Sequence, residues 1–248
     1  MKTRILGAVD TRRAALELLL DLLLDIAALI WPTECAGCGA ADRDCCQSCL
    51  AELRAPPAVL ERDLGTACFV AGHYEGPLAA LLVAFKHGGR VRFAKPLGDC
   101  LRAPLLAGLG ECSGPEPPII VAMPSRPDRV RERGYRHVDL LLARALRRRP
   151  SDGGRIAALR LPALRTLRGR RGQVGLGPLE RARNASLIAV LGPAESLLRG
   201  REAVLVDDVI TTGASVTAAR QALEGAGARV VAIVALGIAE RRDTRGQA

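Results

Sequence analysis

The sequence predicts an α/β domain, in which a parallel sheet carries helices on both faces, preceded by a small cysteine-rich segment. Short aliphatic runs, which suit buried parallel strands, alternate with longer runs of helical periodicity. The 248 residues leave room for one sizeable domain and a small addition, and hydrophobic residues make up 49% of the chain, which is ample for a core. We predict the main domain at residues 58–240 and a flexible tail at 241–248.

The composition limits how the chain can bind its partners. Its formal net charge of +10 allows affinity for phosphates or nucleic acid, although an ordinary solvated basic surface explains the charge as well. Aromatic residues amount to 2%, so stacking of bases on aromatic rings cannot be a widespread mode of binding.

Residues 1–31 have the pattern of an amphipathic helix. A basic start and a leucine-rich run resemble an export signal or membrane anchor, but Glu17, Asp21 and Asp25 recur every four residues along one helix face. Each acid would cost about 2.5–3.5 kcal/mol at a membrane centre. We therefore expect a helix that packs on protein, no membrane span, and a cytoplasmic location.

Residues 32–54 contain two Cys-x-x-Cys pairs separated by seven residues. The four cysteines are Cys35, Cys38, Cys46 and Cys49. Two such pairs can complete a tetrahedral zinc site, and a full shell of four thiolates leaves no position open for catalysis. We therefore predict structural Zn²⁺. Two alternatives stay open, namely a redox dithiol pair and Cys45 in place of Cys46 as a ligand.

The main domain follows a linker at Ala55-Pro56-Pro57. Its first elements are predicted as a strand at Thr66–Tyr74, a helix at 76–87 and a second helix near 92–106. Gly88-Gly89 suits the end of the first helix, because glycine readily adopts the backbone conformation found there. Lys86, next to this glycine pair, could reach an anion or could lie on the surface.

An aliphatic strand at Ile119–Pro124 is followed by a run of arginines. Arginines at the end of a parallel strand suit a polyanion such as pyrophosphate, so Arg126 and Arg133 join Lys86 as candidates for that site. The alternative is an exposed basic loop. A helix comes next, and we expect His137 near its beginning to be structural rather than a catalytic base.

Residues 165–173 are rich in arginine and glycine and lack an apolar period, which is typical of a mobile loop. Such a loop could close over a phosphorylated ligand and exclude water, or it could be a basic insertion that contacts nucleic acid. Strands are expected after it at Ser186–Val190 and, near the end of the domain, at Val230–Gly237.

The most informative stretch is a strand followed by an acidic pair and a turn. Ala203–Val206 has the pattern of a buried strand, and Asp207 and Asp208 come at its carboxyl end, where ligands bind in open parallel sheets. Thr211–Ser215 forms a turn before a helix. Hydroxyls, backbone N–H groups and the positive end of a helix suit a phosphate. Carboxylates suit sugar hydroxyls or Mg²⁺. No Gly-Lys-Ser/Thr follows, which excludes a Walker A loop.

Residues 204–216 resemble the phosphoribosyl pyrophosphate (PRPP) signature of type I phosphoribosyltransferases. The resemblance implies a type I phosphoribosyltransferase-like fold. It makes Asp207 and Asp208 candidate catalytic residues, which would contact the ribose 2′ and 3′ hydroxyls with Mg²⁺ bound alongside PRPP. It also implies that the 5′-phosphate is held by Thr211, Thr212, Gly213, Ala214 and Ser215.

The order of motifs along the whole chain is similar to that of the ComF/GntX family. The matching pieces are the two cysteine pairs, Phe85-Lys86-His-Gly-Gly-Arg90, Pro124 with Arg133-Gly-Tyr135, Arg165–Gln173 with Leu176, Arg181 and Asn184, and Val206–Gly213. Three features depart from the family. His137 stands where a glutamine is usual, Tyr135 stands in place of phenylalanine, and residues 165–173 carry extra arginine.

The family resemblance implies Mg²⁺-dependent transfer of a phosphoribosyl group from PRPP to an unknown acceptor. No residue is an obvious general base for a nucleobase, so a second hypothesis stays open. This is a non-catalytic PRPP- or nucleotide-binding factor in DNA uptake, a process linked to the family in some bacteria. Single-stranded DNA, the DNA-uptake machinery and a second copy of the chain are the partners to consider.

Overall fold

The computed structural model describes residues 34–41, 43–53, 58–59, 64–87, 89–147, 157–167 and 187–239. The helix predicted at 1–31, the linker at 55–57, most of the loop at 165–173 and the tail at 241–248 lie outside the described residues.

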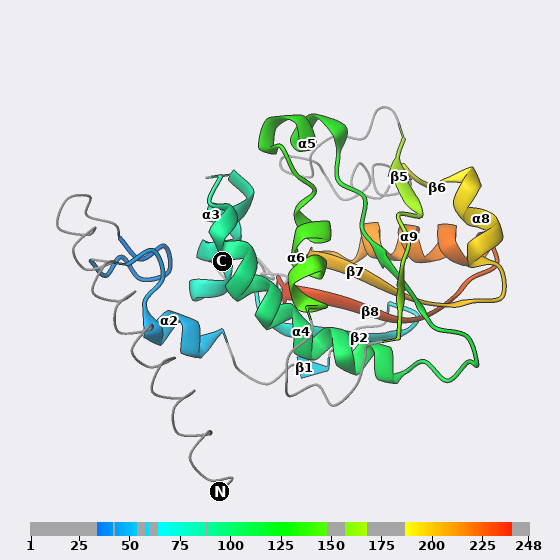
Figure 1. Cartoon of the computed structure of the whole chain (residues 1–248), viewed down its shortest axis with the longest axis horizontal. Coiled ribbons are helices and arrows are strands. Elements are labelled where there is room, and N and C mark those ends of the chain that lie inside the picture. Colours follow the sequence, from blue (N-terminus) through cyan, green and yellow to red (C-terminus); the bar gives the residue numbers. More distant parts are fainter. Residues whose placement is uncertain are drawn as a thin grey trace, which may run out of the picture.

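Helices and strands alternate along most of the described chain (Figure 1). The helices are α2 (Gln47–Glu52), α3 (Gly76–His87), the short 3₁₀ helix η1 (Val91–Phe93), α4 (Ala94–Gly110), α5 (Pro127–Arg133), α6 (His137–Ala145), α8 (Gly192–Leu198) and α9 (Ala214–Gly225). The strands are β1 (Ala58–Val59), β2 (Ala67–His73), β3 (Ile119–Ala122), β4 (Leu159–Arg160), β5 (Leu164–Thr166), β6 (Ile188–Val190), β7 (Glu202–Ile210) and β8 (Arg229–Ile238).

The main sheet has the strand order β1-β2-β8-β7-β3-β4. The five strands from β2 to β4 in this order are parallel, and β1 pairs antiparallel with β2 at one edge. Strands β5 and β6 form a separate antiparallel pair. The predicted parallel α/β architecture is therefore confirmed.

Helices cover both faces of this sheet, and each face has its own hydrophobic core. Helices α3, α4 and α6 pack on the face that carries Val204 and Val206. Helices α8 and α9, together with β5 and β6, pack on the face that carries Leu205 and Ile233. In Figure 1, α9 lies on the opposite side of β7 and β8 from α4. The alternation of faces along β7 is what successive residues of a strand require.

Four elements differ from their predicted form. Strand β7 has nine residues and continues to Ile210, so the acidic pair lies inside it rather than after it. The arginine run forms the short helix α5, with Pro127 in its first turn and Gly134, at φ 80°, at its end. The strand predicted at Ser186–Val190 is shorter and pairs with β5 outside the main sheet. The helix predicted near 92–106 begins as η1 and continues as α4 to Gly110.

The strand order creates a crevice at the carboxyl ends of β3 and β7. From β3 the chain moves outward to β4, whereas from β7 it moves to β8 on the other side, so the two neighbouring strands send their connections in opposite directions. Such a switch point is where open α/β sheets bind ligands. Pairing of β3 with β7 ends at Ala122 and Val206, and β7 continues beyond it beside β8 alone. The continuation of β7 therefore borders the crevice.

Candidate functional site

A pocket of about 400 Å³ occupies this crevice. Its lining comes mainly from the ends of β3 and β7, the segment of helix α5, the end of α3 and the turn before α9, together with Tyr74 after β2 and His137 at the start of α6. It includes eight residues predicted to form the site, namely Lys86, Arg126, Arg133, Asp207, Asp208, Thr211, Gly213 and Ser215. Residues that lie more than 120 positions apart in the sequence thus meet around one cavity.

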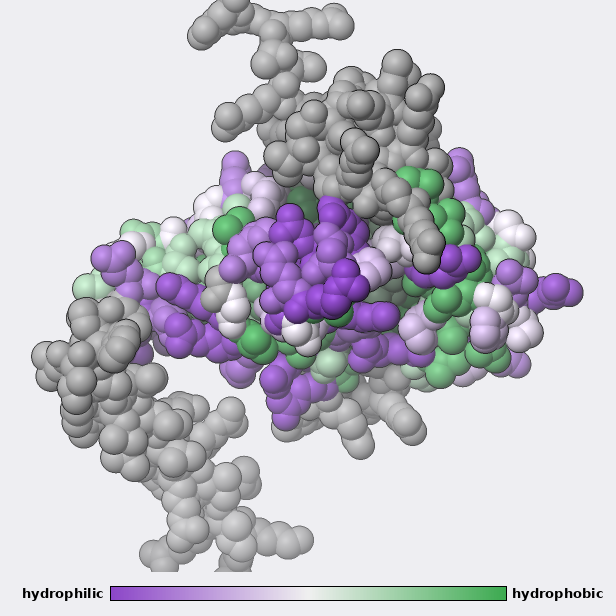
Figure 2. Space-filling view, turned by 90° about the horizontal axis from the view of Figure 1, so that it is seen from above, coloured by the Kyte–Doolittle hydropathy of each residue, from purple (hydrophilic) through white to green (hydrophobic). Residues whose placement is uncertain are grey.

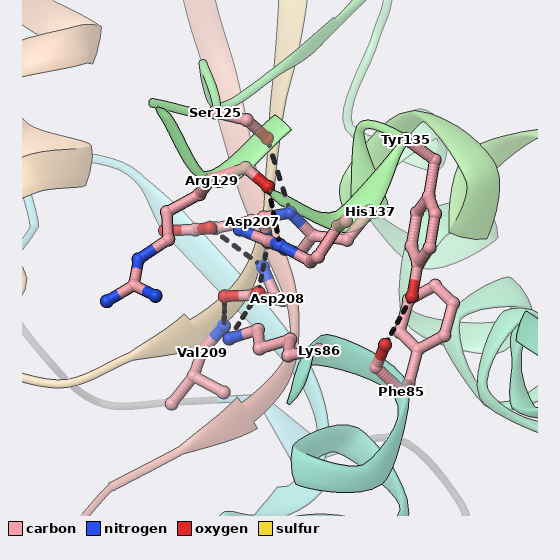
Figure 3. A network of polar contacts seen from close by, with 10 residues as sticks. Phe85, Lys86, Ser125, Arg129, Tyr135, His137, Asp207, Asp208 and Val209 are labelled. Atoms are coloured by element: carbon pink, nitrogen blue, oxygen red, sulfur yellow. Dashed lines mark hydrogen bonds and ion pairs between the residues drawn. The ribbon is translucent and has the colours of Figure 1, made fainter. Parts of the chain in front are cut away.

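The two neighbouring acids have different surroundings. Asp208 is 6% exposed and lies on the sheet face that α3 and α6 cover. Its Oδ2 atom is 2.5 Å from Lys86 Nζ and 2.5 Å from His137 Nε2, and its Oδ1 atom accepts a hydrogen bond of 2.7 Å from the backbone N–H of Val209 (Figure 3). Asp207 is only partly buried, and its Oδ1 atom accepts a 2.8 Å hydrogen bond from the N–H of Asp208.

These surroundings give the two carboxyl groups different pKa values. Burial, followed by the negative charge of Asp208, raises the pKa of Asp207 to about 7. Burial acts in the same direction on Asp208, but the charges of Lys86 and His137 outweigh it and hold the pKa of Asp208 well below its usual range. Asp208 is therefore the permanent anion of the pair, and Asp207 is the acid that a cation or a hydroxyl donor would help to ionise.

Asp208 connects to a fourth polar residue, Ser125, through His137. Ser125 follows β3, and its Oγ atom lies 3.2 Å from His137 Nδ1. Figure 3 shows the imidazole of His137 between Ser125 and Asp208, with Lys86 reaching the same carboxylate from α3. Both Ser125 and His137 line the pocket. We expected His137 to be structural, and the sequence predicted no role for Ser125.

The turn before α9 has the form that a phosphate site needs. Gly213 has a φ of 82°, in the left-handed region that favours glycine, and α9 starts directly after it. The side chain of Thr212 shapes the turn, since its Oγ1 accepts a 3.4 Å hydrogen bond from the N–H of Ala214. Thr212 and Ala214 do not line the pocket, whereas Thr211 and Ser215 do. The positive end of α9 is therefore directed at the cavity.

The opposite wall of the pocket is strongly basic. Arg126, directly before α5, and Arg129 and Arg133 within it line the pocket, and no residue of this helix is buried. Arg126 pairs with Asp128, and Arg129 pairs with Glu132 at 2.7 Å. Nη1 of Arg133, in contrast, is buried without a hydrogen-bond partner among the described residues. Figure 2 looks down on the side where α5 stands out, and hydrophilic residues gather at its centre.

The four predicted metal ligands come together in a separate place. The Sγ atoms of Cys35, Cys38, Cys46 and Cys49 all lie within 4.8 Å of one another. Four thiolates around a tetrahedral zinc, each bonded at 2.3 Å, would be about 3.8 Å apart. The contacts Cys35–Cys49 at 3.8 Å and Cys38–Cys46 at 3.6 Å match that spacing. The cluster could therefore hold a metal ion such as zinc. Cys45 is not part of it, because its thiol is directed at the carbonyl of Cys46.

The cysteine segment packs against the start of α3. A Cβ atom on Gly37 would lie 2.8 Å from Cys49 Sγ and 3.2 Å from Pro77 Cβ, so only a glycine allows this approach. Asp44 of the segment also pairs with Arg92 of η1. The segment is thus attached to the helix whose far end carries Lys86.

Comparison with known families agrees with this geometry. Residues 168–246 match the phosphoribosyl transferase domain. The match supports a place in the type I phosphoribosyltransferase superfamily. It covers β6 to β8, including the acidic pair and the turn before α9. No curated protein matches the chain. Among the helices that the structure describes, none has the length and apolar character of a membrane span.

Proposed function

We propose that the protein binds PRPP in the crevice between β3 and β7 and transfers its phosphoribosyl group to an acceptor, with release of pyrophosphate. One observation carries the proposal. Asp207, the turn before α9 and the arginines at and within α5 line a single pocket, which therefore contains both acidic and basic groups. PRPP has a phosphate at one end, a ribose diol in the middle and a pyrophosphate on the anomeric carbon, so it needs both kinds of group.

The 5′-phosphate would lie at the turn Thr211–Ser215. The first N–H groups of α9 have no carbonyl partner within the helix, and they point toward the N-terminal end. Thr211 and Ser215 also line the pocket. The twelve-residue length of α9 supplies a full helix dipole behind this site.

The ribose would lie against the acidic pair. Carboxylates accept hydrogen bonds from a diol, and Asp207 is the more accessible of the two. Mg²⁺ prefers oxygen ligands from one or two carboxylates plus substrate phosphates, and here it would neutralise charge that develops on the leaving pyrophosphate. The high pKa of Asp207 fits such a site, because a nearby cation favours the ionised form.

The pyrophosphate would face Lys86, Arg126 and Arg133. Arg133 has unused hydrogen-bonding capacity at Nη1, and a bidentate guanidinium matches the oxygens of a phosphate. In the reaction, the bond from the anomeric carbon to pyrophosphate breaks and its electron pair leaves with the pyrophosphate. The lone pair of the acceptor forms the new bond, and the acceptor loses a proton. Positioning and charge neutralisation would provide most of the acceleration.

For the cysteine cluster we propose structural Zn²⁺. The spacing of the thiols supports this assignment over a redox pair, because all four Sγ atoms surround one point. The order of the cysteine pairs and the later motifs also leads us to propose a ComF-type role, in which the protein takes part in DNA uptake or nucleotide sensing.

The test is PRPP binding and turnover. Calorimetric titration of PRPP in the presence of MgCl₂ should show one site, and the double variant Asp207→Ala/Asp208→Ala should bind at least about 100-fold more weakly. Asp139→Asn is the matched control, since this carboxylate pairs with Arg160 and does not line the pocket. Pyrophosphate release is then followed with a panel of nucleobases.

Three other outcomes would change the proposal. Wild-type protein that binds no PRPP contradicts it. Binding without turnover across the panel supports the non-catalytic sensor instead. Tight, steeply salt-dependent binding of single-stranded DNA that survives the double substitution supports a nucleic-acid role.

A further inference from the structure

Two residues of the pocket, Ser125 and His137, have no role in the proposed binding and form a polar chain with Asp208. Ser125 Oγ lies 3.2 Å from His137 Nδ1, and His137 Nε2 lies 2.5 Å from Asp208 Oδ2. The residues come from three separate elements, namely the segment after β3, the start of α6 and strand β7. The side chain of His137 is 12% exposed, so it is shielded from bulk water while remaining at the pocket wall.

The contacts of His137 favour one tautomer of its neutral ring. Nε2 lies 2.5 Å from the anionic Oδ2 of Asp208, which favours the proton on Nε2 and would leave the lone pair on Nδ1. The hydroxyl of Ser125 then donates to Nδ1, which frees the lone pairs of its oxygen to accept a proton from a group in the pocket. The arrangement has the order of a hydroxyl, a base and an orienting carboxylate.

Separate contacts join α3 to the segment before α6. The hydroxyl of Tyr135 already donates to the backbone carbonyl of Phe85, and the two rings pack with their centroids 5.3 Å apart. These contacts join the end of α3 to the segment before α6, and Figure 3 shows them beside the polar chain but separate from it.

We infer that His137 accepts, through the hydroxyl of Ser125, the proton that the acceptor loses during phosphoribosyl transfer. The inference rests on the proposed function. As the acceptor bonds to the anomeric carbon and pyrophosphate leaves, its proton passes to Ser125 Oγ. The original hydroxyl proton passes to His137 Nδ1, and the resulting imidazolium is stabilised by Asp208. Asp208 is thus a positioning residue, which fixes the ring and its tautomer.

Other charged groups surround this chain and will influence any pH profile. Those that line the same pocket are Lys86 and His87 from α3, Arg126, Arg129 and Arg133 from α5, and Asp207 and Asp208 from β7. Variants of His137 must therefore be compared with variants of His87, the other histidine of the pocket, and of Asp207, whose pKa is raised.

The kinetic test compares two nucleophiles that differ in whether they lose a proton. Pyrophosphate release from Mg²⁺–PRPP is measured with water and with sodium azide, since azide bonds to the anomeric carbon without losing a proton. His137→Gln retains an N–H donor for Asp208 but no base. We expect this variant to bind PRPP with an affinity within about threefold of wild type. Its release of pyrophosphate with water should be about 10²-fold slower or more, and azide should restore the rate of release. Ser125→Ala should behave alike, whereas Ser125→Thr keeps the hydroxyl and most of the rate.

Several results would overturn the inference. If His137→Gln released pyrophosphate with water at the wild-type rate and with an unchanged pH profile, His137 would not be the base. Loss of release that azide does not recover, while PRPP still binds, points to a structural role instead. Wild-type protein that binds PRPP but releases pyrophosphate with neither nucleophile also contradicts it. If wild-type protein bound no PRPP, the proposed function would be wrong, and the role of His137 as proton acceptor would be wrong with it.

A second measurement needs no turnover. The chain has three histidines, so the ring ¹⁵N signals of His137 can be assigned by their absence in His137→Gln. We expect the neutral ring to carry its proton on Nε2, and Ser125→Ala to shift the Nδ1 signal. A proton on Nδ1 instead would contradict the relay, whatever the kinetics show.

Discussion

Lys86 Nζ lies 2.5 Å from Asp208 Oδ2, so the last turn of α3 is joined to the centre of the sheet across the base of the pocket. The lysine side chain is 21% exposed and the aspartate is almost fully buried. This ion pair brings together a residue from the start of the domain and one from its end. It also places the ammonium group where the proposed pyrophosphate would lie.

Removing this lysine should destabilise the fold. Lys86→Met leaves the buried carboxylate of Asp208 with His137 alone, and we expect the free energy of unfolding to fall by about 2–3 kcal/mol in urea denaturation. Arg92→Met is the control, because Arg92 pairs with Asp44 at an exposed site and its loss should cost less than about 1 kcal/mol. Equal losses in the two variants would show that the Lys86 pair is no stronger than a surface pair.

Stability should depend on pH through Asp207. The folded state keeps a proton on Asp207 up to about pH 7, whereas an ordinary aspartate releases it near 3.8. Between these values unfolding releases a proton, so raising the pH lowers the free energy of unfolding. Asp207→Asn lacks this effect, and it should gain about 1–3 kcal/mol relative to wild type between about pH 4.5 and pH 7. Asp208, with its lowered pKa, acts below this window. If the free energy of unfolding changed with pH in the same way for wild type and Asp207→Asn, the raised pKa of Asp207 would be contradicted.

A side chain at Gly213 should destabilise the fold. A Cβ atom there would lie 2.5 Å from Leu64 Cδ2, and the φ of 82° already disfavours other residues. Gly213→Ala should cost about 2 kcal/mol or more and weaken PRPP binding. Gly200→Ala is a matched control, because Gly200 has a φ of 72° with nothing within 4 Å, and should cost about 1 kcal/mol. Similar thermal stability of both variants would argue against the clash.

The metal site can be tested with two adjacent cysteines. Purified wild-type protein should contain about one zinc per chain. Cys46→Ser should lose most of that zinc and melt at a lower temperature, because Cys46 belongs to the four-sulfur cluster. Cys45→Ser should keep both the zinc and the melting temperature, since Cys45 lies outside the cluster. Zinc loss from Cys45→Ser alone would reverse the assignment, and wild-type protein without zinc would exclude a Cys₄ site.

Local patterns predicted much of this protein. Apolar periodicity predicted the parallel sheet, the helix at 76–87 and the buried strands at Ile119–Ala122 and Val230–Gly237. It can do so because an element that is buried on one face or both has apolar residues at regular intervals in its sequence. The Cys-x-x-Cys spacing likewise indicated which thiols gather, since a short turn holds both sulfurs near one point. In these cases neighbours in sequence were sufficient, as the interactions are local or repeat regularly.

The tertiary structure decided how the two acids differ. Asp207 and Asp208 look like an equivalent pair in the sequence, yet β7 continues through them and strand geometry directs adjacent side chains to opposite faces. Only the packing of α3 and α6 brings Lys86 and His137 to Asp208. That packing depends on contacts between residues far apart in the chain, which leave no periodic signal. The sequence thus determined the architecture and the residue types of the pocket, while the pairing of helices with sheet faces decided which acid is buried, which is available to a ligand and where a histidine base lies.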